Sequence, residues 1–127
     1  MIISGHGDEG GFIFGEFAPE IDVSALSNGH LSAEAIGARA NLPETVVIST
    51  ACGTGGKAFA SAFLDGGSSA YIAPEGYPDG ADAALFVHRL MHGMLRAGRP
   101  LEDAFRLAQV TDEPECRFTL YGGESRG

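Results

Sequence analysis

The chain has 127 residues, of which 44% are hydrophobic and 20% are charged, a composition typical of a single globular domain. Its net charge of −9 argues against nucleic acid or an anionic membrane as a partner, because phosphate binding depends on Lys and Arg. No apolar run is long enough to cross a membrane, and the start of the chain lacks the pattern of a signal peptide, so we expect a cytoplasmic protein.

The first third of the chain predicts short strands, a surface segment and one helix. In chain order these are a strand at 2–5, a small strand at Phe12–Phe14, a surface segment at 16–30 and a helix through about Ala40. Asn28-Gly29 is a strong turn signal. Ser32 has the character of an N-cap, and Glu34 sits favourably in the first helical turn.

The rest of the chain predicts alternating strands and helices. In order these are a strand at 46–51, a helix at about 55–64, a strand at 69–73, a helix from Asp79 or Asp82 to about Ala97, a helix with Pro100 at its first position, and a strand at 117–121. The apolar stripe of the long helix comprises Ala83, Val87, Leu90, Met91, Met94 and Leu95. This order indicates an α/β three-layer sandwich with a mostly parallel sheet, in one domain over residues 1–127.

The candidate catalytic residues follow the ends of two predicted strands. His6 follows the first strand inside glycines, and Cys52 follows the strand at 46–51 ahead of a glycine-rich turn. In open parallel sheets, ligands bind at the carboxyl ends of the strands, and neighbouring strands lie about 4.8 Å apart. If these two strands are neighbours, the imidazole and the thiol form a pair in which the thiolate is the nucleophile.

The surroundings of Cys52 favour the same chemistry. The helix that follows it has a positive N-terminal end, which favours the thiolate. Gly7 and Gly53 leave backbone N–H groups uncovered beside the thiol, and such donors stabilise the oxyanion that forms during acyl transfer. The two loops together predict a nucleophilic cysteine with a base and oxyanion donors.

Four runs of sequence resemble the CHAT domain of the caspase-like peptidases: HG at 6–7, NGHLSAEAI at 28–36, VVISTACGTGG at 46–56 and FTLYG at 118–122. The resemblance covers nearly the whole chain and keeps the order of the motifs. The interval between His6 and Cys52 is close to the roughly 50 residues typical of caspases. The resemblance implies a His6–Cys52 dyad, an oxyanion hole lined by the amides of Gly7 and Cys52, and an antiparallel terminal strand that begins with Cys116.

Two features depart from that family. Its sheet normally begins with two strands before the histidine strand, so either this chain is a partial fold or another subunit, such as a second copy, covers the apolar edge at Ile2 and Ile3. Relatives that cleave after Arg or Lys often carry an acid two residues before the cysteine, where this chain has Thr50, which we include among the candidate residues of a substrate pocket. The preferred substrate side chain therefore does not follow from the resemblance.

Other interpretations of the glycine-rich turn fit less well. CGTGGK resembles a phosphate-binding loop, but that pattern needs Gly at 51 and Ser or Thr at 58, where the chain has Ala51 and Ala58. A thiol phosphatase needs an arginine shortly after Cys52, and the neighbouring residues supply none. The plain alternatives are that Cys52 is a small buried hydrophobic residue and that His6 is packed within its loop.

The sequence allows two interpretations of several other polar residues. His88 and His92 have the spacing for a shared metal ion, but no HExxH pattern and no completing ligand accompany them, so we expect a solvated helix face. Glu75, Asp79 and Asp82 follow the strand at 69–73. They form either an acidic pocket for a basic side chain or caps of the next helix.

Three more residues lie near the predicted site. Asp8 and Glu9 follow His6, and we favour solvation over a role in orienting the imidazole. Cys116 would lie two strand spacings, about 9.6 Å, from Cys52, which is beyond disulfide reach. We therefore expect Cys116 to be a bystander thiol.

The leading expectation is a cysteine endopeptidase that cleaves a polypeptide through an acyl-enzyme on Cys52, with His6 as general base or acid. It needs no metal or organic cofactor. A rival from another class is a non-catalytic interaction module on the same fold, which a buried Cys52 or a His6 turned away from it would favour. A third is a thiol-dependent hydrolase or acyltransferase that acts on a small acyl substrate.

Overall fold

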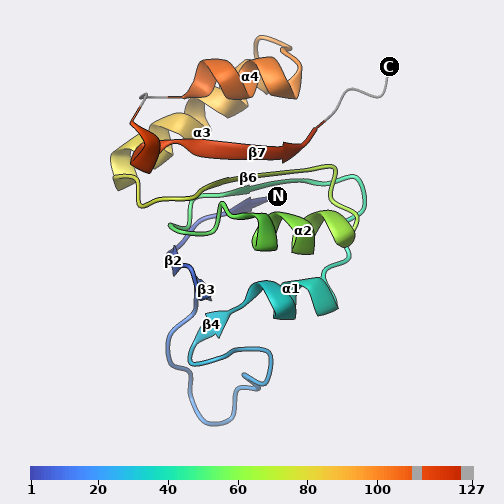
Figure 1. Cartoon of the computed structure of the whole chain (residues 1–127), viewed down its shortest axis with the longest axis vertical. Helices are drawn as coiled ribbons and strands as arrows, with labels where there is room; N and C mark the ends of the chain where they lie inside the picture. Colours follow the sequence, from blue (N-terminus) through green and yellow to red (C-terminus); the bar gives the residue numbers. More distant parts are fainter. Residues whose placement is uncertain (110–112, 124–127) are drawn as a thin grey trace.

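The computed structural model describes residues 1–109 and 113–123, which contain two sheets. The larger sheet has β1 (Ile2–Ile3), β5 (Val46–Ser49), β6 (Ala70–Pro74) and β7 (Phe118–Gly122), in that spatial order (Figure 1). The smaller sheet has β2 (Gly7–Asp8), β3 (Gly11–Ile13) and β4 (His30–Leu31), also adjacent in that order. His6 lies between β1 of the larger sheet and β2 of the smaller one, and Cys52 follows β5.

The larger sheet is mostly parallel. β5 pairs in parallel with β1 on one side and with β6 on the other, whereas β7 pairs antiparallel with β6. The strands that precede His6 and Cys52 are therefore neighbours, as the sequence predicts. The carboxyl ends of β1, β5 and β6 meet at one edge of the sheet, which is where such sheets bind ligands.

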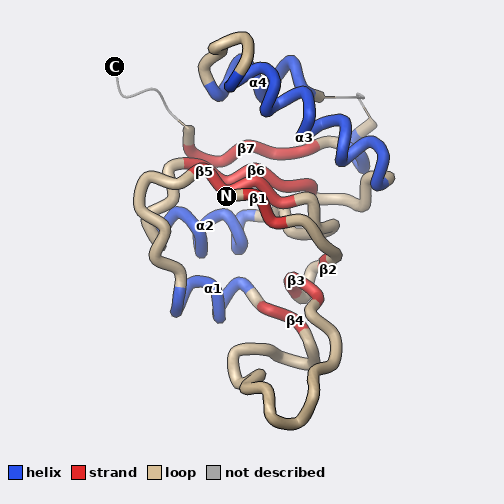
Figure 2. The backbone as a smooth tube through the Cα atoms, turned by 180° about the vertical axis from the view of Figure 1, so that it is seen from behind, coloured by secondary structure: helices blue, strands red, loops and turns tan. Residues whose placement is uncertain are grey.

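Helices cover both faces of this sheet (Figure 2). α1 (Ala33–Arg39) and α2 (Lys57–Asp65) lie on one face, and α3 (Gly80–Leu95) and α4 (Leu101–Ala108) lie on the other. Along β5, Val47 joins the core under α1 and α2, and Ile48 joins the core under α3 and α4, because successive side chains of a strand point to opposite faces. The predicted α/β class with a mostly parallel sheet is confirmed. Within the described ranges, no helix combines the length and the apolar character of a membrane span.

Local capping signals set the starts of two helices. Ser32 caps α1 by accepting a hydrogen bond from the N–H of Ala35 at 3.2 Å. Asp79 caps α3 by accepting from the N–H of Ala81 at 2.8 Å. Each cap satisfies a backbone donor that has no partner inside its helix. Of the two acids predicted as caps for α3, Asp79 takes the role and Asp82 lies in the first turn.

The buried stripe of α3 differs from the predicted one. Leu95 is 75% exposed, whereas Phe86, which the prediction omitted, is 1% exposed and stacks on Phe118 with ring centroids 3.9 Å apart. Five residues rotate a helix by about 140° beyond a full turn, which carries Leu95 away from the buried Leu90. Pro100 is the N-cap of α4 rather than its first helical residue.

The segment between His6 and α1 forms the smaller sheet and a long surface excursion (Figure 1). Asn28 and Gly29 have φ values of 51° and 79°, so they form the tight turn that the sequence predicts before β4. Near the other end of the chain, Cys116 closes a short 3-10 helix, η1 (Pro114–Cys116), instead of beginning β7.

The loops that follow β1 and β5 pack backbone against backbone. A Cβ atom on Gly7 would lie 2.7 Å from the carbonyl oxygen of Cys52, and one on Gly53 would lie 2.9 Å from the carbonyl carbon of Asp8. Gly53 also has a φ of +71°, in the left-handed region that disfavours side chains. The close approach that brings the His6 loop to the Cys52 loop therefore requires both glycines.

We expect Gly53→Ala to lower the free energy of unfolding by about 1–3 kcal/mol more than Gly98→Ala does. Gly98 has a similar φ of +66° but nothing within 4 Å of a Cβ, so its substitution measures backbone strain alone. The additional loss of stability expected for Gly53→Ala comes from the contact between the new Cβ and the backbone of Asp8. Urea unfolding of both variants measures the difference, and equal losses would show that the two loops have room to separate.

Candidate active site

His6 and Cys52 line one cavity at the carboxyl edge of the larger sheet. Its volume is about 660 Å³, within the range of ligand pockets. Ser4 and Thr50 line it beside His6 and Cys52, and residues of α3 complete its wall. The fold therefore brings together two residues that the sequence places far apart.

The His6 imidazole and the Cys52 thiol share this cavity without a hydrogen bond between them. His6 is exposed in the loop between β1 and β2, and Cys52 is half-buried in the turn after β5. Within residues 1–109 and 113–123, neither side chain makes a hydrogen bond. Catalytic hydrogen bonds are often long or poorly aligned in unliganded sites. What the fold provides is a common, solvent-accessible space for the two groups.

A buried polar network holds the turn that presents Cys52. The Thr54 hydroxyl donates to the Ala51 carbonyl at 2.7 Å and lies 3.1 Å from the Ser49 hydroxyl. The Ser49 oxygen in turn accepts from the N–H of Ala51 at 3.1 Å. Tyr71 donates its hydroxyl to the Thr54 carbonyl at 2.8 Å, and burial raises the pKa of Tyr71 to about 12, so this group stays a donor. The backbone on both sides of Cys52 is thereby fixed.

Two backbone N–H groups in this turn differ in availability. The N–H of Gly53 donates to the carbonyl of Gly76 at 2.9 Å, which removes Gly53 from the predicted oxyanion donors. The N–H of Cys52 has no acceptor in the part of the chain that the structure describes. A substrate oxyanion can therefore take a hydrogen bond from Cys52 without displacing an existing one.

The N–H of Gly7, the other predicted donor, points away from its ladder partner. Ile13 donates to the His6 carbonyl at 2.9 Å, which makes Gly7 and Phe12 a non-hydrogen-bonded pair of the β2–β3 ladder. In such a pair the N–H groups turn outward from the ladder. No acceptor meets the Gly7 N–H among the described residues, so it too is available to a ligand.

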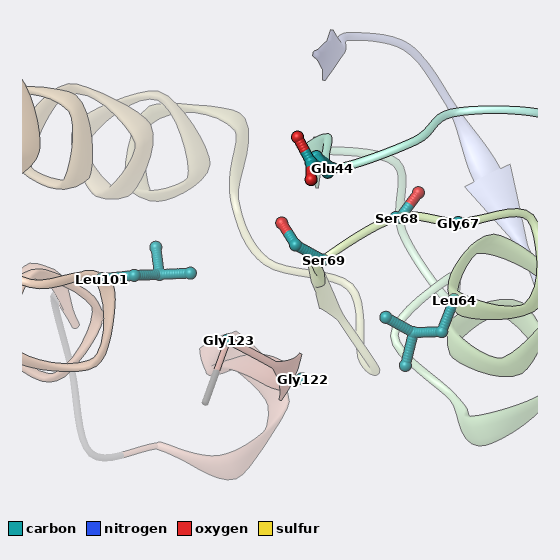
Figure 3. Close-up of a pocket in the computed structure, with 8 residues that line it drawn as sticks. All are labelled: Glu44, Leu64, Gly67, Ser68, Ser69, Leu101, Gly122 and Gly123. Carbon is teal, nitrogen blue, oxygen red and sulfur yellow. The ribbon is translucent and has the colours of Figure 1, made fainter. Parts of the chain in front are cut away.

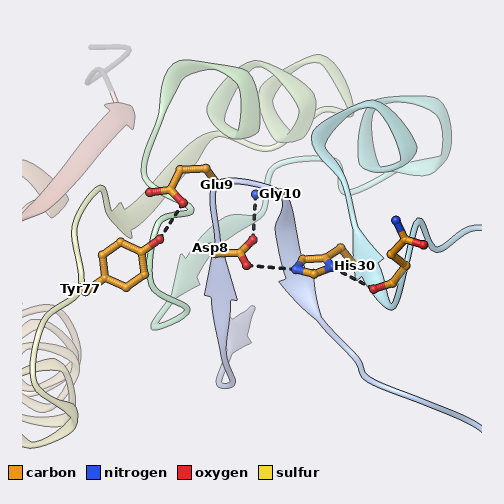
Figure 4. Close-up of polar contacts among 6 residues, drawn as sticks. Asp8, Glu9, Gly10, His30 and Tyr77 are labelled. Atoms are coloured by element: carbon orange, nitrogen blue, oxygen red, sulfur yellow. Dashed lines mark hydrogen bonds and ion pairs between the residues drawn. The ribbon is translucent and has the colours of Figure 1, made fainter.

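Further contacts tie the loops of this edge together (Figure 4). The Tyr77 hydroxyl, in the loop after β6, donates to the Glu9 carboxylate at 2.7 Å. This hydrogen bond raises the pKa of Tyr77 to about 12 and lowers the pKa of Glu9. The N–H of Gly55 donates to the Pro74 carbonyl at 2.8 Å, joining the loops after β5 and β6. Glu9 is exposed, as predicted, and it also links two loops.

Asp8 pairs with His30, and not with His6 or with solvent alone as predicted. Oδ2 of Asp8 lies 3.1 Å from Nε2 of His30, and Nδ1 of His30 lies 3.1 Å from the Asn28 carbonyl oxygen (Figure 4). Both ring nitrogens face acceptors, an arrangement that favours the imidazolium. The hydrogen bond to Asp8 raises the pKa of His30, and the same bond lowers the pKa of Asp8. No local sequence signal connects Asp8 with a histidine 22 residues away.

Only one of the four residues predicted to shape a substrate pocket lines the cavity. That residue is Thr50. Glu75 accepts instead from the Tyr121 hydroxyl at 3.4 Å, Asp79 caps α3, and Asp82 lies in the first turn of that helix. The capping alternative is therefore confirmed for Asp79, and the three acids do not line this cavity.

Helix α3 supplies a wall of the cavity that the sequence prediction missed. Ala83, Ala84, Val87 and His88 all line it. Their spacing marks one helix face, but nothing in the sequence shows which strand end that face covers. His88, predicted to be solvated, is exposed and also reaches the cavity, whereas His92 does not line it. Among the described residues, no three His, Cys, Asp or Glu are placed to hold a metal ion.

The second cysteine lies in a different environment. Both cysteines are free, and Cys116 is half-buried in η1. Its Sγ lies 4.0 Å from Oε2 of Glu113. Burial and the Glu113 carboxylate raise the pKa of the Cys116 thiol, which lowers its thiolate fraction near neutral pH.

Another cavity lies at the amino ends of β5 and β6, at the opposite edge of the sheet (Figure 3). Its volume is about 630 Å³, and its lining residues with oxygen-bearing side chains are Glu44, Ser68 and Ser69. The Ser68 hydroxyl is buried with no hydrogen-bond partner in the described residues. None of the predicted catalytic, oxyanion or substrate-pocket residues lines this cavity, so the candidate active site is the cavity at the carboxyl edge.

No protein-family model, curated protein or solved structure matches this chain. The residues gathered at the carboxyl edge of the sheet are therefore the physical basis for a functional proposal. They comprise a histidine, a cysteine and available backbone N–H groups in one place.

We expect Thr54→Val to lower the free energy of unfolding by about 1–3 kcal/mol, because it leaves the buried Ala51 carbonyl and Ser49 hydroxyl without their Thr54 partner. Thr45→Val is the matched control, since the Thr45 hydroxyl donates to the Pro43 carbonyl at an exposed site. Its effect is expected within about 0.5 kcal/mol. Denaturant unfolding measures both, and similar values would mean that the network does not hold the Cys52 turn.

The Asp8–His30 pair predicts a pH-dependent stability. The raised pKa of His30 adds stability that is fully present below its ordinary value of 6.5 and is lost as the pH rises through the raised value. The lowered pKa of Asp8 adds stability that is present above 3.8 and is lost as the pH falls through the lowered value. The pair therefore stabilises the fold most between these limits.

Thermal unfolding of His30→Gln tests this window. The Tm difference from wild type is expected to be largest near about pH 5.5 and to shrink by about pH 8.5, where the imidazole is neutral in both states. His92→Gln, on the exposed face of α3, is the control for loss of a surface histidine. A difference that does not change with pH would contradict the ion pair.

Proposed function

We propose that this chain is a caspase-like cysteine peptidase domain of the CHAT type, which hydrolyses a peptide bond through an acyl-enzyme on Cys52. One observation carries the proposal: His6 and Cys52, from the ends of two adjacent parallel strands, line a single cavity. The sequence motifs around both residues support it. So does the terminal strand β7, which runs antiparallel as the resemblance implies.

The reaction uses the two side chains in two steps. His6 takes the thiol proton, and the sulfur of Cys52 attacks the carbonyl carbon of the peptide bond. The C–N bond breaks, the amine leaves with the proton from His6, and a thioester remains. His6 then takes a proton from water, the resulting hydroxide attacks the thioester carbon, and the acid leaves as the proton returns to the sulfur. Peptide and water become acid and amine, without electron transfer or a cofactor.

The available backbone donors stabilise the intermediate in this scheme. As the sulfur attacks, negative charge develops on the former carbonyl oxygen, and fixed N–H groups lower the barrier by meeting that charge. The N–H groups of Cys52 and Gly7 take this role, because neither has an acceptor among the described residues. Gly53 is not included, since its N–H already donates to Gly76.

The rival proposal is a non-catalytic interaction module on the same fold. Two observations favour it: the imidazole and the thiol are not hydrogen-bonded, and β1 is an edge of the described sheet. Ile2 on this edge is 48% exposed, and an uncovered apolar edge pairs readily with another strand. Under either proposal, we expect a further polypeptide segment to cover Ile2 and Ile3, from a second copy or from elsewhere in the same protein.

Selective alkylation separates the two proposals. We expect iodoacetamide near neutral pH to modify Cys52 at least about tenfold faster than Cys116, because an imidazole that accepts the thiol proton increases the reactive thiolate. His6→Ala should lower the rate at Cys52 toward that of Cys116. Mass spectrometry of the digested protein measures both sites in one sample.

His92→Ala is the control, since this α3 histidine does not line the cavity. It should leave the rate at Cys52 within about twofold of wild type. Equal reactivity of Cys52 and Cys116, or a rate at Cys52 that is the same in wild type and His6→Ala, would rule out the proposed dyad. The interaction module would then be the better proposal.

A further inference from the structure

The cavity beside Cys52 is lined in part by small apolar residues of α3. Its apolar lining residues are Ala83, Ala84 and Val87 from α3, together with Pro78 and Ile2. Its polar side chains are hydroxyls, the thiol and imidazoles. None of the described residues that line it is an Asp, Glu, Lys or Arg.

Three of the carboxylates near the cavity loops in sequence accept hydrogen bonds from other groups. Glu9 accepts from Tyr77 at 2.7 Å, and Asp79 accepts from the N–H of Ala81 at 2.8 Å. Glu75 accepts from Tyr121. Each of these contacts holds a carboxylate at a partner that does not line the cavity.

These surroundings determine which side chain can enter. A lysine, arginine or aspartate side chain would lose water on entering, and the described lining residues include no Asp, Glu, Lys or Arg to pair with it. An aliphatic side chain would remove its own apolar surface and that of Ala84 and Val87 from water. The volume of about 660 Å³ exceeds what one such side chain needs, so shape does not exclude it.

We propose that the cavity binds an uncharged aliphatic side chain on the acyl side of the cleaved bond, packed against Ala84 and Val87 of α3. This assignment rests on the proposed function, because a substrate side chain next to the reacting carbonyl enters the cavity when that carbonyl lies at Cys52. The peptidase then prefers bonds that follow residues such as valine or leucine. Bonds that follow basic or acidic residues are poor substrates.

Affinity labelling tests the assignment on the full chain. Three peptidyl chloromethyl ketones that differ in the last side chain (leucine, lysine or aspartate) are compared by the rate at which each modifies Cys52. We expect the leucyl reagent to react at least about tenfold faster than the other two. Equal or faster reaction of the lysyl or aspartyl reagent overturns the assignment. So does failure of all three where iodoacetamide still modifies Cys52.

A charge placed on the wall gives a second, independent readout. Ala84→Glu puts a carboxylate on an exposed helix position that lines the cavity, and it should reverse the preference so that the lysyl reagent reacts faster than the leucyl one. Leu85→Glu is the matched control, since Leu85 is exposed on the same helix but does not line the cavity. It should leave the ratio of the two rates within about twofold of wild type.

The two proposals fail in different ways. An Ala84→Glu variant that stays folded but keeps the wild-type ratio overturns the assignment of the wall, even if Cys52 reacts in a His6-dependent manner. Labelling that is independent of His6, together with no hydrolysis of a leucyl-aminocoumarin peptide, overturns the peptidase and not the apolar preference. Circular dichroism of each variant confirms that the compared proteins are folded.

Discussion

The backbones of two loops, 4–9 and 50–56, lie against each other so closely that neither Gly7 nor Gly53 has room for a side chain. This contact places His6 and Cys52 at one cavity, since each lies next to one of the two glycines. The parallel pairing of β1 with β5 brings the loops to the same edge, but strand pairing alone sets only their spacing. The glycines turn that spacing into direct backbone contact, and the proposed chemistry depends on it.

The same loops show how one set of hydrogen bonds leaves a site available. Hydrogen bonds among Ser49, Thr54 and Tyr71 fix the turn that carries Cys52. The Gly53 N–H donates to the Gly76 carbonyl, whereas the adjacent N–H of Cys52 has no acceptor among the described residues. Rigid support beneath a nucleophile and unengaged donors beside it are the arrangement that acyl transfer needs. Glu9 and Asp79 meanwhile accept hydrogen bonds from other groups, and the described residues that line the cavity include no Asp, Glu, Lys or Arg.

Much of the fold follows from local patterns. Ser32 and Asp79 begin their helices as predicted, because a cap acts within one turn of backbone. The predicted buried stripe of α3 was wrong at two positions, because Leu95 is exposed and Phe86 is buried. Phe86 stacks on Phe118, which belongs to an element far away in the chain. The prediction for Asp8 missed its partner for a similar reason, because His30 is 22 residues away in the chain, after a long surface segment.

The sequence by itself determined that a histidine and a cysteine would each follow a short apolar strand and lie among glycines, because apolar periodicity and glycine placement are properties of short segments. That the two strands are parallel neighbours was a condition of the prediction, and the tertiary structure met it. The sequence did not determine which N–H groups would remain available, that Asp8 would bind His30, or that α3 would form an apolar wall beside Cys52. Those outcomes depend on contacts between segments distant in the chain. Such contacts are set only when the loops and helices pack together in three dimensions.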